Sequence, residues 1–517
     1  MSNRAQTMRN TLLSSAGIYT EYFLGMIVSI VIARHLGPSD FGTYSLIVWL
    51  VAIGVMSTNS GTTTAIIKFV AELRGAGRED LIAPMVGYLR RAQRVFLVIV
   101  LAIGATVMFF AGDRLAPGFN HLMLLALLVF SVALRANYMF NISLAKGFEN
   151  FGATASIAML ATPLNLGMVI VAWYLDAPIE GFLAIFAISS VVFFATSTWQ
   201  TRRLIPPGDQ RARLPDDLLR RVRRHMKLVA LTVTVSYCTA SETEVLFLNL
   251  LDSASAAGEF KVAYQLAVGA ALLVPGMFSA VLLPMMAKAL TESRELAARR
   301  LSASTTYLAM LAAPLIGFGF VFSDPTIRLL YGNAYAAAGP VLAGTLFALS
   351  IGKVAQGAQS MLLSADHQHS ILIRVVATGT LKLVLDVMLI RAFGLMGAVV
   401  AYTTATLADC LLTLALGLKV SGAKLDWGRI GRIALAIGLA CALAFPLREV
   451  DRPVISVVVG GLVLSGAYAL LTLLLGCWSR ADVEYLKTLH RRIARERPQA
   501  LANLLTWAGT RAAKDYT

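Results

Sequence analysis

Eight ionisable residues lie inside stretches of sequence that are otherwise apolar. They are the acids Glu21, Glu242, Glu244, Asp386 and Asp409 and the bases Arg135, Lys353 and Lys382. A charged side chain at the centre of a membrane costs roughly 2.5–3.5 kcal/mol on insertion scales, so such residues normally face a cavity or pair with an opposite charge. The chemistry that suits these residue types is the binding and movement of ions or of a charged ligand.

Arg135 and Lys353 are the bases best suited to hold an anionic ligand. A guanidinium offers a bidentate fork to a phosphate, and an ammonium offers a point charge. Arg34 and Lys261, at the outer rims of two apolar stretches, and Lys382, inside another, are further candidates for substrate binding. Each cation also has a structural alternative, in which a carbonyl group or a nearby acid of its own half of the chain holds it.

The acids are candidates for ion coupling, because a buried carboxylate can take up and release a proton. Glu242 and Glu244 point about 200° apart on a helix, so both cannot face one cavity. Lys382 and Asp386 are one helical turn apart, which favours mutual neutralisation over ligand binding. A structural role remains the alternative for all five acids.

Motifs for covalent or cofactor chemistry are missing from the sequence. The glycine-rich segments lack a following GKS or GKT, and the four cysteines show no CxxC spacing. The histidine pair in His367-Gln368-His369 fits a solvated loop better than a metal site. We therefore expect a transporter rather than an enzyme, with no metal or cofactor, driven by a proton or sodium gradient or by the gradient of its own substrate.

The composition requires a membrane protein. Of 517 residues, 57% are hydrophobic and 14% are charged, and the mean hydropathy is +0.71; soluble domains carry about 25% charged residues. The apolar stretches predict about fourteen transmembrane helices. Their predicted ranges are 11–33, 43–67, 95–111, 121–144, 153–175, 181–200, 228–250, 262–287, 303–323, 337–363, 375–390, 395–418, 433–447 and 453–476.

The net charge of +16 is explained by its distribution over the loops. With a cytoplasmic N-terminus, 35 of the 45 Lys and Arg residues fall in cytoplasmic segments, 7 fall in outward segments and 3 lie inside spans. This bias follows the rule that cytoplasmic loops carry the positive charge. It predicts that both termini are cytoplasmic, and it makes a nucleic-acid partner unnecessary.

An internal repeat organises the chain. Gly42 and Gly258, Arg78 and Arg294, and Gly181 and Gly397 are each 216 residues apart, and Arg135 and Lys353 are 218 apart. Parallel repeats of this kind bind substrate where the two copies meet. The predicted domains are an N-terminal six-helix lobe (1–205), a basic cytoplasmic linker (206–227), a C-terminal six-helix lobe (228–420), two further helices (421–476) and a basic cytoplasmic tail (477–517).

Three segments resemble the polysaccharide transporter family, the Wzx-type flippases of lipid-linked oligosaccharides. They are RHLGPSDFGTYSL at 34–46, IRLLYGNAYAAAGPVL at 327–342 and GLMGAVVAY at 394–402. The resemblance covers roughly residues 5–420 with the order and spacing preserved. It implies the fold of the multidrug/oligosaccharidyl-lipid/polysaccharide exporter superfamily: an all-α polytopic protein with two six-helix lobes in a V around a central cavity, plus two C-terminal helices.

The resemblance also implies a function. The protein is expected to move undecaprenyl-pyrophosphate-linked oligosaccharide units across the bacterial inner membrane by alternating access, for lipopolysaccharide or exopolysaccharide synthesis. A polysaccharide polymerase and a chain-length regulator are the protein partners implied. One departure is notable: cavities of this family are cationic, whereas the acids inside the spans outnumber the bases five to three.

Two other functions fit parts of the sequence. A cation-coupled multidrug exporter of the same superfamily fits the fold and the membrane acids. A membrane-embedded glycan polymerase or ligase fits less well, because that class needs a sizeable outward loop for its catalytic residues, and the outward loops here are about a dozen residues or shorter.

Overall fold

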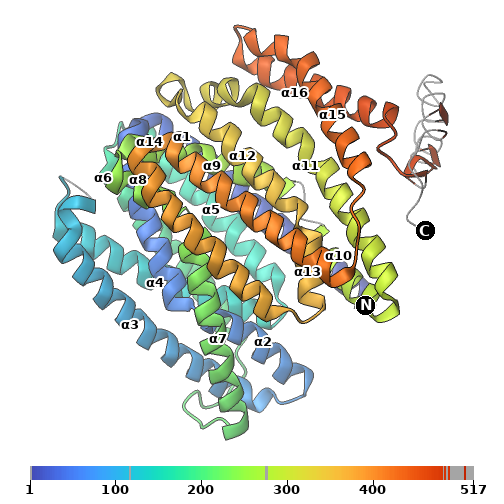
Figure 1. Cartoon of the computed structure of the whole chain (residues 1–517). Coiled ribbons are helices and arrows are strands. Elements are labelled where there is room, and N and C mark those ends of the chain that lie inside the picture. Colours follow the sequence, from blue (N-terminus) through green and yellow to red (C-terminus); the bar gives the residue numbers. More distant parts are fainter. Residues whose placement is uncertain are drawn as a thin grey trace. The chain divides into compact units, whose positions relative to one another are not determined.

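The computed structural model describes residues 3–115, 118–240, 242–273, 278–480, 482–484, 487–488, 506–507 and 510. The regular elements in these residues are helices (Figure 1), as the composition predicts. The chain divides into two compact units, Met1–Val262 and Ala263–Thr517.

The first unit is built around the long helix α1. Its elements are α1 (Asn3–Asn59), α2 (Thr62–Gly75), η1 (Glu79–Leu81), α3 (Ile82–Leu115), α4 (His121–Gly147), α5 (Phe151–Tyr174), α6 (Ile179–Arg202), α7 (Asp216–Ala240), α8 (Thr243–Leu251) and the start of α9 (Ala254–Leu273). α1 packs along α5, and α4 packs along α6 and α2.

The second unit contains the rest of α9 and the remaining helices. These are α10 (Phe278–Glu292), α11 (Arg294–Tyr331), η2 (Asn333–Tyr335), α12 (Ala338–Val354), α13 (Gln356–Ser364), α14 (Gln368–Ser421), α15 (Trp427–Ala444), η3 (Phe445–Glu449) and α16 (Pro453–Leu474). α11 packs against α12 on one side of the unit and contacts both α15 and α16.

In the described residues, ten helices are long and apolar enough to cross a membrane. They are Tyr19–Asn59, Glu79–Gly112, His121–Gly147, Ala155–Tyr174, Ile179–Arg202, Arg294–Tyr331, Ala338–Ser364, Gln368–Ser421, Trp427–Glu449 and Pro453–Leu474. The first and the eighth are each interrupted by a non-helical glycine, Gly37 before Pro38 and Gly394. Each of these two long helices therefore holds two of the spans expected from the sequence, and the total of fourteen stays a prediction.

Another expected span is broken more sharply. The sequence predicts one helix over 228–250, but α7 ends at Ala240 and α8 begins at Thr243. Glu242 lies between them with a φ of 51°, in the left-handed region that non-glycine residues seldom adopt. The expectation of one uninterrupted helix is wrong, because helical geometry cannot continue through a residue with positive φ.

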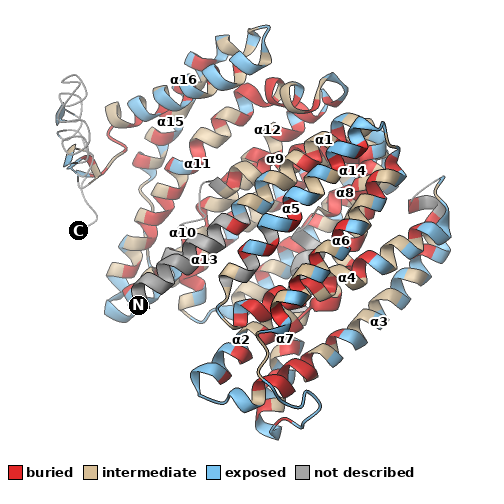
Figure 2. Cartoon of the chain, turned by 180° about the vertical axis from the view of Figure 1, so that it is seen from behind, coloured by how far each residue is buried: buried red, intermediate tan, exposed pale blue. Residues whose placement is uncertain are grey.

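The hydrophobic cores show what holds each unit together. In the first unit a cluster that includes Phe69, Leu89 and Phe140 joins α2, α3 and α4, and Leu214 and Leu218 bring the linker and α7 onto it. Figure 2 marks buried residues of α2 and α7 in red. The linker expected at 206–227 is thus partly packed against the N-terminal helices rather than fully solvated.

Two glycines allow α1 and α9 to meet closely within the first unit. A Cβ atom on Gly42 would collide with the carbonyl oxygen of Ala254, and one on Gly258 would collide with that of Pro38. These are the same glycines that mark the first position of the internal repeat. Their close approach gives a physical reason for glycine at both positions.

We predict that Gly42→Ala destabilises the protein by about 1–3 kcal/mol, the usual cost of overpacking. The loss arises because the backbone at Ala254 must move to admit the new methyl group. Thermal unfolding of the purified protein in detergent measures the effect. Gly25→Ala, on the same helix and with no heavy atom within 4 Å of the added Cβ, is the matched control and should not lower the melting temperature.

Candidate functional site

Arg135 lies on α4, in the middle of a helix long enough to cross the membrane. Its Nε donates a hydrogen bond to Ser190 Oγ at 2.8 Å, and its Nη2 donates one to Ser189 Oγ at 3.0 Å. Both serines lie on α6, and both hydroxyls donate to the carbonyl oxygen of Phe186 at 2.8 Å. The hydroxyl protons are therefore directed away from the arginine, and the oxygen lone pairs are left to accept from it.

The guanidinium of Arg135 also lies 4.0 Å from the centre of the Phe186 ring. This is a cation–π contact, which is strongest when the pair is removed from water. The serines and the ring fix the direction of the guanidinium, and all three groups are neutral. In the described residues no carboxylate lies within ion-pair distance of Arg135, and only two of its five N–H donors form hydrogen bonds.

Glu21 is the acid whose charge acts on Arg135. It lies on α1, its side chain is exposed, and its carboxylate is attracted first by Arg135 and then by Lys146. Tyr138, one turn from Arg135 on α4, is buried and packs on Phe193 with ring centres 4.9 Å apart. The first unit thus combines an oriented cation (Arg135), a carboxylate beyond ion-pair distance (Glu21) and two packed aromatic rings.

Lys353 lies in the last turn of α12, directly before the break at Ala355 that separates α12 from α13. It is half-buried, and in the described part of the chain its ammonium group forms no ion pair or hydrogen bond. Lys353 and Arg135 therefore share one property: each is a cation in a membrane-spanning segment without a carboxylate held against it.

Lys382 and Asp386 are placed differently. Both lie on α14, their side chains are almost completely buried, and Lys382 Nζ is 3.1 Å from Asp386 Oδ2. The ion pair expected from their spacing of four residues is confirmed. Their candidate roles in substrate binding and ion coupling stay predictions, with the pair neutralised as it stands.

Asp409 is also paired, by a residue that sequence reasoning assigned to a loop. Arg374 lies inside α14, is buried, and forms an ion pair with Asp409, while Thr378 donates a hydrogen bond to the same carboxylate at 3.1 Å. The placement of Arg374 in a loop is wrong, because α14 begins at Gln368 and extends over it. Since 35 residues separate the partners, no local spacing rule could have found this pair.

The helix break at Glu242 carries a third ion pair. Glu242 Oε2 is 2.5 Å from Lys261 Nζ, which links the start of α8 to α9 within the first unit. Glu244, two residues further on, is fully buried. The two acids face different surroundings, but the helical angle of about 200° expected between them does not apply, because Glu242 lies at the break and not within a helix. Arg34 is exposed near the end of the first half of α1.

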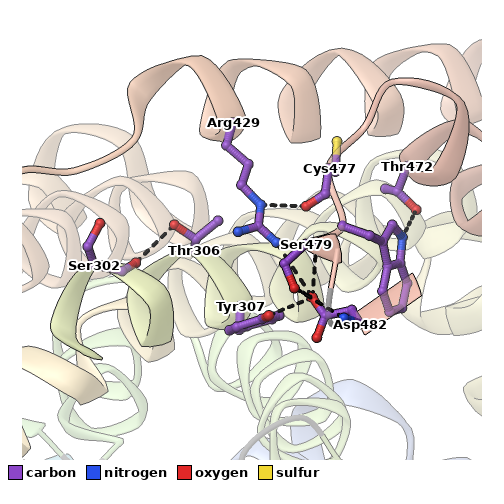
Figure 3. A network of polar contacts seen from close by, with 9 residues as sticks. Ser302, Thr306, Tyr307, Arg429, Thr472, Cys477, Ser479 and Asp482 are labelled. Carbon is purple, nitrogen blue, oxygen red and sulfur yellow. Dashed lines mark hydrogen bonds and ion pairs between the residues drawn. The ribbon is translucent and has the colours of Figure 1, made fainter. Parts of the chain in front are cut away.

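A further buried cation is not among the candidates predicted from the sequence. Arg429, expected in a cytoplasmic loop, lies on α15 with its side chain fully buried. It donates to the carbonyl oxygen of Cys477, and its guanidinium lies 5.3 Å from the ring centre of Tyr307 on α11. Asp482 accepts from the Tyr307 hydroxyl at 2.5 Å (Figure 3). This network ties the beginning of the tail and the last two helices to α11, so these tail residues are packed rather than solvated.

The sequence also matches a known protein family. Residues 7–290 match the model of a family described as polysaccharide biosynthesis protein. None of the curated proteins matches this chain.

Among solved structures, the chain is similar to the lipid II flippase MurJ in an inward closed conformation. The TM-score is 0.68 at 13% identity, over 90% of this chain and 98% of that one. It is also similar to an inward-facing multidrug resistance transporter of the MATE family (TM-score 0.61, 15% identity, 80% of this chain and 98% of that one). A mutant of the MATE transporter VcmN of Vibrio cholerae gives a TM-score of 0.55 at 16% identity, over 80% and 96% of the two chains. At these identities the matches establish the fold.

We predict that Asp386→Asn destabilises the protein by about 3–5 kcal/mol, because it leaves the ammonium of Lys382 buried beside a neutral partner. The double variant Lys382→Met/Asp386→Leu should recover most of this loss, because an apolar pair of similar volume needs no charge compensation. Thermal unfolding of both variants measures the difference. Equal destabilisation by the single and double variants would contradict this explanation, because the double variant leaves no buried charge without a partner.

Proposed function

We propose that this chain, which belongs to the polysaccharide biosynthesis protein family, is a flippase for undecaprenyl-pyrophosphate-linked oligosaccharides. The family and the structures that the chain resembles are those of transporters and flippases rather than enzymes. The proposed direction is from the cytoplasmic to the periplasmic face of the bacterial inner membrane, with both termini cytoplasmic. The product would be used for lipopolysaccharide or exopolysaccharide synthesis.

The observation that carries this proposal is the state of Arg135. Transfer of a pyrophosphate through hydrocarbon would cost tens of kcal/mol by Born estimates, so a flippase needs a positive charge where the head group crosses. Arg135 supplies one that is oriented by Ser189, Ser190 and Phe186 without being neutralised by them. An arginine with free N–H groups in this setting can bind a phosphate oxygen in bidentate fashion.

Lys353 supports the same proposal from the second unit. It is a half-buried cation at a helix interruption, and discontinuous helices are where transporters place their ligand-binding groups. In the proposed mechanism each cation is available to the pyrophosphate within its own unit during an alternating-access cycle, while the polyprenyl chain stays in lipid. A proton or sodium gradient, or the substrate gradient alone, would drive the cycle. Partners such as a polymerase and a chain-length regulator belong to the same proposal.

One observation favours a second function, export of cationic drugs coupled to an ion gradient. Glu21 is exposed on a membrane-spanning helix and interacts electrostatically with Arg135. A carboxylate next to an arginine could exchange protons or cations during transport, and the fold is shared with MATE transporters. A drug exporter would need Glu21 more than Arg135, whereas the proposed flippase needs the cations.

We predict that Arg135→Gln lowers the rate of flipping at least about tenfold, because one charge-assisted hydrogen bond to a phosphate is worth about 1.5–3 kcal/mol. Arg135→Lys should retain part of the rate, since it keeps the charge but loses the fork. The assay is the translocation of a fluorescent polyprenyl-pyrophosphate-linked sugar in proteoliposomes, with ethidium efflux measured in parallel. Arg211→Gln, an exposed substitution in the linker, is the control.

Lys353→Gln should give a similar loss of flipping while the protein remains folded. The lysine makes no ion pair in the described residues, so its replacement by a neutral side chain removes only the charge available to substrate. The variant should match the wild type in melting temperature and in membrane insertion. Full flipping by both Lys353→Gln and Arg135→Gln would overturn the proposal, and loss of ethidium efflux in Glu21→Gln alone would favour the drug exporter.

A further inference from the structure

Three arginines form a second cationic cluster in the first unit. Arg90 and Arg94 are one turn apart on α3, immediately before its apolar stretch, and Arg202 is the last residue of α6. We call these three residues the Arg90 cluster. By the charge pattern of the loops, this end of α3 and this end of α6 both belong to the cytoplasmic side of the membrane.

Hydrogen bonds through Asn141 bring the two helix ends together. Arg90 Nη2 donates to Asn141 Oδ1 at 3.0 Å, and Asn141 Nδ2 donates to Thr198 Oγ1 at 3.0 Å. Asn141 is buried, and Thr198 lies one helical turn before Arg202 on α6. The positive charges of Arg94 and Arg202 repel that of Arg90. The hydrogen bonds through Asn141, together with the one-turn spacings from Arg90 to Arg94 and from Thr198 to Arg202, place the three arginines where these ends of α3 and α6 meet.

The charges of this cluster are not balanced by acids in the described part of the chain. Other arginines near the same end of the first unit do have such partners, Arg221 with Glu72 at 2.8 Å and Arg78 with Asp80 at 3.4 Å. Among the described residues, the only side chain that accepts a hydrogen bond from the Arg90 cluster is the neutral amide of Asn141, and the buried Nε of Arg90 has no acceptor there. The guanidinium of Arg90 also lies 5.5 Å from the centre of the neutral Phe140 ring. Like charges held together without an acid favour binding of an anion.

The surroundings indicate which kind of anion. Val98 lies one turn beyond Arg94 on the same face of α3, and its side chain is 66% exposed. Arg94 and Arg202 are exposed as well. A ligand at this place meets guanidinium groups and, one turn further along the same face of α3, exposed apolar side chains, as an anionic lipid does at the membrane surface.

We propose that the Arg90 cluster binds the phosphate of an anionic lipid at the cytoplasmic surface of the membrane. Arg90, positioned by Asn141, supplies the fixed charge. Arg94 and Arg202 supply exposed N–H groups that close on the phosphate oxygens, and the acyl chains lie against the apolar stretch of α3. This site is distinct from the mid-membrane cations proposed for transport and does not depend on the transport function.

The experiment compares two double variants of the full-length protein purified in a neutral detergent. Arg94→Gln/Arg202→Gln removes the exposed members of the cluster and leaves the Arg90–Asn141 hydrogen bond in place. Arg213→Gln/Arg220→Gln removes the same amount of charge from exposed linker positions and is the matched control. Melting temperatures without added lipid establish that both variants are folded.

Binding is titrated by native mass spectrometry with three probes: dioleoyl phosphatidylglycerol, the neutral lipid dioleoyl phosphatidylcholine, and inorganic phosphate as competitor. We expect the Kd for phosphatidylglycerol to rise about tenfold or more in the cluster variant, the equivalent of about 1.4 kcal/mol, and to stay at the wild-type value in the control. Phosphatidylcholine should bind all three proteins alike.

The outcomes separate the sources of the phosphate. If millimolar inorganic phosphate displaces phosphatidylglycerol only weakly, a lipid head group is the ligand. If it displaces the lipid completely, the same arginines form a site for free phosphate, and the assignment to lipid is overturned. An equal rise in Kd in both double variants would show that lipid binding depends only on net charge. No rise in either would show that the cluster does not contribute to binding. Either result would overturn the proposal.

Discussion

The constraint on which this structure depends is the cost of a charge in an apolar medium. Each ionisable side chain within the membrane-spanning helices must be neutralised, placed next to polar groups or left for a ligand to neutralise. Three acids are neutralised within their own unit: Asp386 by Lys382, Asp409 by Arg374 and Glu242 by Lys261. Arg135 and Lys353 are treated differently, because no acid of the described chain is held against either of them.

The difference matters because a buried ion pair contributes little to ligand binding. The fields of its two charges cancel at a distance. Opening the pair leaves two uncompensated charges in an apolar medium, which is unfavourable. A cation oriented by neutral groups keeps its field. The serine hydroxyls and the Phe186 ring do this for Arg135, since they restrict its rotamers and partly replace its hydration while the full charge remains. The price is a destabilised resting state, which binding of an anion would relieve.

How much of this could be foreseen depends on sequence distance. The helical fold follows from hydropathy, and the Lys382–Asp386 pair follows from a spacing of four residues on one helix. The partners of Arg135, 54 and 55 residues away on α6, and the pairing of Arg374 with Asp409 depend on which helix faces which, and one sequence does not specify that. The break at Glu242 was missed for another reason: hydropathy averaged over a span does not sense one residue in the left-handed region. The sequence places Arg374 and Arg429 in loops because a charged residue at the end of an apolar run usually marks a loop. The rule fails for both because a helix can extend over such a residue and bury it.

The surplus of membrane acids in the sequence, five against three bases, departs from the cationic cavities of the family that the sequence resembles. The structure changes that balance. Arg374 joins the buried bases, and Lys261 accounts for Glu242, so each of Asp386, Asp409 and Glu242 is already matched by a cation. In the described part of the first unit, Arg135 is then left with no carboxylate held against it, while Glu21 acts on it from α1 and Glu244 is buried on α8. In the second unit, Lys353 is the corresponding cation. The two proposals depend on different members of this remainder: a flippase needs the cations Arg135 and Lys353, whereas a drug exporter needs the carboxylate of Glu21, although solved structures of both kinds share the fold.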